Sequence, residues 1–145
     1  MIALIQRVSE AKVVVNGDIS GKIGRGLLVL LAVQPEDSPA TVTRMVERVL
    51  GYRVFEDDEG RMNLSLLQLS LELLVVPQFT LAADTRKGTR PSFTSAAPPD
   101  KGREYFDRFV VECKNRLDSV ETGVFAANMQ VSLVNEGPVT FWLEA

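Results

Sequence analysis

The chain has 145 residues, of which 46% are hydrophobic and 24% charged, and its 16 Lys and Arg against 19 Asp and Glu give a formal net charge of −3. It contains no histidine and one cysteine, Cys113; this excludes Ser-His-Asp and Cys-His catalysis, zinc sites built on histidine, and an internal disulfide. The acidic balance argues against broad coating of nucleic acid but allows a local basic patch.

The composition and length predict one folded domain over residues 1–145. No apolar run approaches the ~20 residues that a membrane helix needs, so no membrane partner is expected. A single cysteine fits a reducing compartment, and the expected location is cytoplasmic. No cluster of side chains requires a metal, and neither a metal nor another cofactor is expected.

The N-terminal part is predicted to form strands. Two apolar runs, residues 2–5 and 12–15, precede Asn16-Gly17, a dipeptide typical of tight hairpins because both residues tolerate positive φ. The return strand is expected at 18–23. After a glycine-rich turn, the continuous apolar run at 27–33 indicates a strand buried on both faces.

A helix is predicted next, capped by Ser38, with Pro39 in its first turn and Gly51 at its end. Its buried face is indicated by the i, i+3, i+4, i+7 spacing of Val42, Met45, Val46 and Val49.

Strands are then expected at 52–55 and 71–79, separated by an acidic turn at 57–60. That turn resembles half of a calcium loop, but it lacks the partner Glu, and a solvated turn is favoured. Residues 82–99 are irregular, and loops of this length are usually functional or mobile.

A second helix is predicted from about Asp100, with a buried stripe that includes Phe106, Phe109 and Cys113. This pattern favours Cys113 as a core residue over a nucleophile. Two final strands, 124–134 and 139–143, are expected to be joined by a turn at 135–138. The order of elements indicates an α/β protein of the α+β type.

Three short segments contain candidate functional residues. Pro77 marks the end or edge of a strand, where Gln78 and Thr80 point to one side and Phe79 to the other. This geometry suits a ligand site, but it also suits an ordinary strand end with polar residues outward. Thr80 has no histidine to activate it as a nucleophile.

From their residues alone, the other two segments also allow both a functional and a purely structural interpretation. Arg86, Lys87 and Arg90 surround Gly88 and suit phosphates, although a solvated charged loop is the commoner arrangement. Gly137-Pro138 reads as a turn whose peptide isomer the sequence does not show. Arg7 is expected either to be exposed or to reach a neighbouring terminal strand.

Taken together, the segments resemble the D-aminoacyl-tRNA deacylase family. The resemblance is carried by residues 1–8, 26–31 and 47–55, by Pro77-Gln78-Phe79-Thr80-Leu81, which is similar to the family's Ser-Gln-Phe-Thr-Leu motif, and by Asn135 to Thr140, which match Asn-x-Gly-Pro-Val-Thr. It covers nearly the full chain, and the pair of motifs is more specific than either alone.

The resemblance implies a homodimer with a curved, barrel-like, mostly antiparallel sheet and two main helices. It implies hydrolysis of the ester in D-aminoacyl-tRNA, and in glycyl-tRNA mischarged on tRNA(Ala), as a step of chiral proofreading in translation quality control. The implied partner is the acceptor end of aminoacylated tRNA, not DNA.

The resemblance also implies roles for individual residues. A cis Gly137-Pro138 bond would project into the partner subunit's pocket, braced by Arg7, and would exclude an L side chain. The implied catalytic segment is Gln78, Phe79 and Thr80, with Pro77, Phe125 and Met129 beside the substrate, and tRNA contacts are expected at Arg86, Lys87 and Arg90.

A chain without histidine suits this reaction because an aminoacyl ester is already activated. The protein needs only to orient water and stabilise the oxyanion, for which backbone N–H groups near Phe79 and Thr80 are candidates. The family's suggested helper is the 2′-hydroxyl of the terminal adenosine. Pro77 replaces the family's usual serine and removes a hydrogen-bond donor. A catalytically weakened module that binds tRNA or a nucleotide is therefore the alternative function, and a dimeric scaffold is a third.

Overall fold

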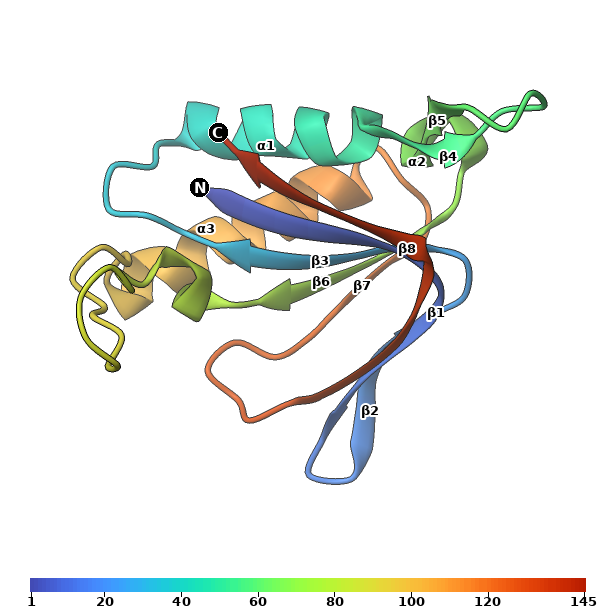
Figure 1. The fold of residues 1–145 in the computed structure, drawn as a ribbon. Helices are drawn as coiled ribbons and strands as arrows, with labels where there is room; N and C mark the ends of the chain where they lie inside the picture. The colour runs from blue at the N-terminus through green and yellow to red at the C-terminus, as the bar shows by residue number, and fades with distance from the viewer.

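The computed structural model describes residues 1–145 and shows a strongly curved sheet with two long helices across one face (Figure 1). Strands of the main sheet follow the order β2-β1-β3-β6-β7, and β8 pairs with β1 as well. In chain order the elements are β1 (Ile2–Val15), β2 (Asp18–Ile23), β3 (Gly26–Ala32), α1 (Pro39–Gly51), β4 (Arg53–Glu56), β5 (Met62–Ser65), α2 (Leu66–Leu69), β6 (Glu72–Pro77), the 3-10 turn η1 (Phe79–Ala82), α3 (Pro99–Lys114), β7 (Val120–Thr122) and β8 (Gln130–Glu144).

The first strand, β1, is continuous, so the prediction of two separate strands at 2–5 and 12–15 was wrong. Its first half pairs with β3 and its second half with β2, while β8 pairs along both halves on the other side. Polar residues in the middle of β1 interrupt the apolar pattern but not the backbone ladder, because β-pairing does not require apolar side chains at every position.

The hairpin and the central strand follow the sequence prediction. Asn16 and Gly17 both have positive φ, 50° and 82°, and they connect β1 to β2. Strand β3 is buried along nearly its whole length and pairs in parallel with β6. At the start of this pairing a Cβ on Gly26 would lie 1.8 Å from the carbonyl oxygen of Glu72, so only glycine fits.

The two predicted helices are confirmed. Ser38 caps α1 through a capping box with Thr41, and the predicted face of α1 is buried. Helix α3 begins at Pro99, one residue before the predicted start, and buries Phe106, Phe109 and Cys113. Burial raises the pKa of the Cys113 thiol to about 12, which makes it a core residue, as predicted, and an unreactive one.

The C-terminal part differs from prediction. Residues 124–129 lie outside any strand, and β8 continues through residues 135–138, where a turn was expected. The pairing with β1 explains how the strand continues. Val8 is opposite Asn135 and Gln6 is opposite Thr140, so Arg7 alone faces residues 136–139. The extra residues form a bulge in a continuing strand instead of a turn between two strands.

Four short elements were not predicted: β5, α2, η1 and β7. The predicted strand at 71–79 is also too long, because β6 ends at Pro77 and η1 begins at Phe79. The acidic segment after β4 is a solvated turn, as expected. The Asp57 carboxylate accepts the N–H groups of Arg61 and Glu59. The bond from Arg61, followed by that from Glu59, lowers the pKa of Asp57, although desolvation acts in the opposite direction.

Apolar residues fill both faces of the curved sheet. A cluster of 25 buried residues lies between the sheet and helices α1 and α3. A smaller cluster, with residues from β1, β2, β3 and β6, fills the concave side that β8 helps to close. The α+β class and the barrel-like curvature are therefore confirmed. The sheet is mixed: β1 pairs antiparallel with three strands, and β3–β6 and β6–β7 are parallel.

Candidate active site

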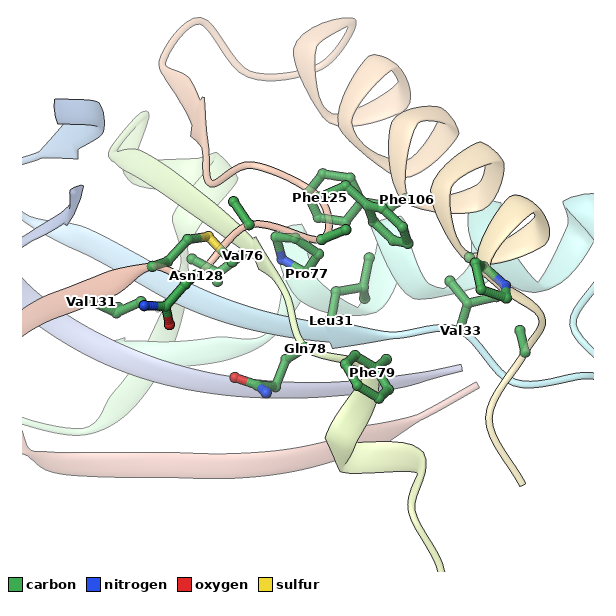
Figure 2. A pocket seen from close by; sticks show the side chains of 16 residues that line it. Leu31, Val33, Val76, Pro77, Gln78, Phe79, Phe106, Phe125, Asn128 and Val131 are labelled. Atoms are coloured by element: carbon green, nitrogen blue, oxygen red, sulfur yellow. The ribbon is translucent and has the colours of Figure 1, made fainter. Parts of the chain in front are cut away.

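A cleft of about 430 Å³ opens where β3 and β6 end, between α3 and the segment that connects β7 to β8 (Figure 2). Its walls are mostly apolar. Phe106 and Phe125 lie on the α3 side, and Gln78 and Phe79 lie on the opposite side (Figure 2). The sixteen lining residues are Leu31, Val33, Val76, Pro77, Gln78, Phe79, Ala97, Pro99, Gly102, Phe106, Phe125, Ala126, Ala127, Asn128, Met129 and Val131.

Five of the predicted site residues meet in this cleft: Pro77, Gln78, Phe79, Phe125 and Met129. The first three come from the end of β6, and the last two come from the segment before β8. The structure thus brings together two parts of the chain that are about 50 residues apart in sequence.

The segment after Pro77 is not the expected strand end. The N–H of Gln78 donates to the Leu31 carbonyl, 2.8 Å away, and Gln78 then leaves extended geometry with φ −142° and ψ 70°. The predicted strand does not continue through this segment, so strand alternation does not determine where the Gln78 and Thr80 side chains point. Their side chains nevertheless meet, since the Gln78 amide donates to the Thr80 hydroxyl.

Backbone N–H groups of Phe79 and Thr80 stand at the start of η1, where no carbonyl of the turn accepts them. Phe79 is 57% exposed, and Thr80 is exposed beside the cleft without lining it. This corner provides two donors next to an apolar cavity, an arrangement that suits a developing oxyanion.

Pro77 is the last residue of β6, a position where a strand tolerates a residue without an N–H donor. In the sheet, Gln78 makes the bond to β3, so the nitrogen of residue 77 faces the β7 side. The last residues paired with β7 are Val75 with Thr122, and the Gly123 N–H donates to the Val75 carbonyl at 2.8 Å just before this position. A proline is tolerated at the end of a strand, where the ladder stops.

The opposite wall is made by aromatic rings. Phe125 is 6.5 Å from Phe106 between ring centroids, and the Arg103 guanidinium lies 4.8 Å above the Phe125 ring. The Met129 sulfur is 3.3 Å from the Val124 nitrogen. Arg103 at the lip of the cleft was not among the predicted site residues, and nothing in its local sequence distinguishes it from an ordinary surface charge.

Gly137 and Pro138 do not line this cleft. They are exposed in the bulge of β8, and the peptide bond between them is cis, as the resemblance implied. Asn135 spans the bulge: its side-chain oxygen accepts the N–H of Val139 at 2.8 Å, and its amide donates to the Thr140 hydroxyl at 2.9 Å. Asn135 belongs to the recognised motif but was not assigned a role, although Asn close before Gly-Pro is a readable local signal of a side chain bonded to nearby backbone.

Arg7 is buried and braces the bulge from beneath. Its Nε donates to the Glu136 carbonyl at 2.9 Å, and its Nη1 donates to the Val54 carbonyl at 2.8 Å. A Cβ added to Gly137 would lie 3.3 Å from Arg7 Nη2. Arg7 thus reaches the terminal strand, which was one of the two arrangements expected for it. Its contact with the Val54 carbonyl could not be predicted from the sequence.

The three predicted tRNA contacts, Arg86, Lys87 and Arg90, are exposed on a loop beyond η1. Asp84 and Ser92 close this loop through two backbone hydrogen bonds of 2.8 and 3.0 Å. Arg86 forms an ion pair of 2.7 Å with Asp84, and this pairing holds the pKa of the Asp84 carboxyl well below its usual range.

No group of three or more Cys, Asp and Glu side chains lies together in a way that would hold a metal ion. No helix is long and apolar enough to cross a membrane.

Comparison with known proteins gives consistent results. The family described as D-Tyr-tRNA(Tyr) deacylase matches residues 4–144. Curated relatives named D-aminoacyl-tRNA deacylase, from Escherichia coli strain K12 / DH10B and from Shigella boydii serotype 18, are 56% identical over 144 residues and cover 99% of both chains.

Two solved structures share the fold. One, titled a c-Myc DNA Unwinding Element Binding Protein, superposes with a TM-score of 0.95 at 38% identity and covers 100% of this chain and 99% of its own. The other, titled a probable eukaryotic D-amino acid tRNA deacylase, gives 0.86 at 19% identity over 99% of this chain and 98% of its own. The family match covers nearly the whole chain, and it includes both motifs and the three residues Pro77, Gln78 and Phe79 that line the cleft. The chain therefore belongs to the D-aminoacyl-tRNA deacylase family.

Proposed function

We propose that this protein hydrolyses the ester between a D-amino acid and the 3′ end of tRNA, and that it does so in the cleft at the end of β6. The observation that carries the proposal is the corner at Gln78–Thr80, where two backbone N–H groups stand beside an apolar cavity in a member of this family. The products are a free D-amino acid and tRNA with a free 3′ end.

The reaction needs little from the side chains. Water attacks the ester carbonyl carbon, negative charge develops on the carbonyl oxygen, and the ribose oxygen leaves with a proton. The N–H groups of Phe79 and Thr80 stabilise that charge, a contribution of about 10²–10³-fold for one such donor in comparable sites. The Thr80 hydroxyl is held by Gln78 and has no base beside it, so its role is positioning, not nucleophilic attack.

Stereochemical selection is assigned to the backbone of Gly137–Pro138 supplied by a second copy of the chain. The bulge is exposed, held by Arg7 and Asn135, and remote from its own cleft. From Val131 at the cleft to Pro138 the strand covers roughly 20 Å. Backbone atoms placed against the α-carbon exclude an L side chain of any kind, and they accept glycine, including glycine mischarged on tRNA(Ala), because it has no side chain to exclude.

The proposed assembly is a homodimer formed along β8. This 15-residue strand pairs only with β1, so no strand covers its other edge, where Arg48 donates to the Glu144 carbonyl near the end. Val134 and Trp142 on β8 are each 49% exposed. A long unprotected edge with exposed apolar side chains is a surface that proteins normally cover.

The proposed tRNA contact is confined to the acceptor end, through Arg86, Lys87 and Arg90. A net charge of −3 and a small basic loop suit a few phosphate contacts, for which log affinity falls shallowly with log salt. This footprint suits tRNA and not a wide DNA groove. We propose that the protein works in the cytoplasm, because aminoacyl-tRNA is made and used there.

The alternative, favoured only by Pro77 in place of serine, is a module that binds aminoacyl-tRNA without cleaving it. The decisive measurement is the rate of ester loss from D-Tyr-tRNA and L-Tyr-tRNA with and without the protein. Multiple turnover on the D substrate and none on the L substrate is expected. A binder slows the spontaneous loss of both esters, and that result would refute the proposal.

A further inference from the structure

Two aromatic rings lie outside the apolar core at the mouth of the cleft. Phe79 and Phe93 are 57% and 44% exposed, and their ring centroids are 5.2 Å apart at an interplanar angle of 54°. Phe79 lines the cleft, whereas Phe93 does not. The pair therefore extends outward from the cavity onto the molecular surface.

The backbone that carries Phe93 is fixed on both sides. Ser92 is held to Asp84 by two hydrogen bonds, and the Phe93 carbonyl accepts the N–H of Ala96 at 3.1 Å. The Ser95 hydroxyl donates to the Ala82 carbonyl. A ring held on a braced backbone loses little conformational freedom when a ligand contacts it.

Phe93 connects the cleft to the loop of Arg86, Lys87 and Arg90, because its ring contacts Phe79 and its backbone directly follows that loop. Residue 92, directly before Phe93, closes that loop, on which Lys87 and Arg90 form no ion pair with any carboxylate. An apolar aromatic face next to unpaired cations is the combination that binds single-stranded nucleic acid, because bases stack on the ring while the cations contact phosphates.

We propose that Phe93, together with Phe79, is a stacking platform for the unpaired nucleotide that precedes the terminal adenosine of the tRNA. The inference rests on the proposed function, which puts the aminoacyl-adenosine in the cleft. The next nucleotide leaves the cleft past Phe79, stacks on Phe93, and leads its phosphate toward Lys87 and Arg90. Stacking on a ring is tolerant of sequence, which suits an enzyme that acts on several tRNAs.

The test compares Phe93→Leu with Phe93→Tyr on two substrates, D-Tyr-tRNA and the single nucleoside ester 3′-D-tyrosyl-adenosine. Leucine keeps an apolar cover over Phe79 but removes the ring, and tyrosine keeps the ring. Because Phe93→Leu removes the stacking surface, KM for D-Tyr-tRNA is expected to rise about tenfold in this variant with kcat unchanged. Activity on 3′-D-tyrosyl-adenosine is expected to stay at the wild-type value, and Phe93→Tyr is expected to match wild type on both substrates.

A spectroscopic readout is independent of catalysis. Deacylated tRNA with 2-aminopurine at the penultimate position is expected to lose fluorescence on binding to wild type and to Phe93→Tyr, but not on binding to Phe93→Leu. Equal losses of activity on both substrates, or no loss on either, would overturn the platform. A dimer that dissociates in Phe93→Leu would also overturn it, by assigning the ring to the subunit interface. If wild type cleaves neither substrate, the proposed function fails instead.

Discussion

At the scale of single residues, Pro77 is the position where the motif lacks the side-chain donor that is usual in the family. It is the last residue of β6, two residues beyond the last β6–β7 pair, and it lines the mostly apolar cleft. The donors at this corner belong to the backbone of the two residues after Gln78, which any side chain at position 77 leaves in place.

Pro77→Ser is therefore expected to change kcat/KM for D-Tyr-tRNA by less than about tenfold, the effect of gaining or losing one ordinary hydrogen bond. The measurement is single-turnover deacylation at matched enzyme concentration, with unfolding curves to show that both proteins are folded. A gain of about a hundredfold would mean that a hydroxyl at this position acts as an oxyanion donor, and the backbone mechanism would then be incomplete.

Cys113 gives a prediction about stability and pH. Burial in the native state raises the pKa of its thiol from an ordinary value of 9.0 to about 12. Below pH 9 the thiol is protonated in both states, so the full stabilising contribution is present. As pH rises from 9 to 12, only the unfolded chain ionises, and this contribution is lost.

Wild type is expected to lose on the order of 1 kcal/mol more than Cys113→Ala in free energy of unfolding between pH 8 and pH 10. Urea unfolding of both proteins at the two pH values measures the difference, and the alanine variant cancels the titration of lysines and tyrosines. Parallel losses in the two proteins would show that the thiol ionises in the native state.

At the scale of elements, the sequence predicted those elements whose ends and buried faces depend on neighbouring residues. Helix α1 was predicted from its cap, its first-turn proline and its apolar spacing, and these are the interactions that define it. Strands β1 and β8 were each divided in two, because the sequence shows where apolar residues stop but not where backbone pairing continues. The bulge opposite Arg7 depends on the pairing of residues more than 120 apart, and no window of sequence contains that information.

The cleft was predictable only in part for the same reason. Pro77, Gln78 and Phe79 form a contiguous motif, and the family resemblance was enough to assign them. The other wall comes from α3, which carries Phe106 and Arg103, and from a segment with no regular structure that carries Phe125. Their positions depend on how α3 packs on the sheet, which only the complete fold determines.

At the scale of the whole molecule, the cleft and the Gly137–Pro138 bulge are separate on one chain, so the proposed reaction needs two chains. Two variants separate the parts. Gly137→Ala distorts the bulge, since its Cβ would lie 2.7 Å from Val139 Cγ2 and since φ is +139°. Ala127→Trp fills the cleft, which Ala127 lines.

Each variant alone is expected to lose deacylation of D-Tyr-tRNA. When the two are co-expressed with different tags and purified through both tags, every dimer contains one chain of each kind. One of its two clefts then has both an intact lining and an intact bulge from the partner, so about half of the wild-type activity per dimer is expected to return.

The matched control carries both substitutions on one chain, paired with a wild-type chain. Here each cleft lacks either its lining or its partner's bulge, so these dimers are expected to be inactive although they contain the same mutations. Active control dimers together with inactive mixed dimers would show that cleft and bulge work within one chain, because the intact wild-type chain would then be sufficient by itself. The two arrangements give opposite results in the same pair of preparations, so the assay assigns the bulge to its own subunit or to the partner without a structure of the complex.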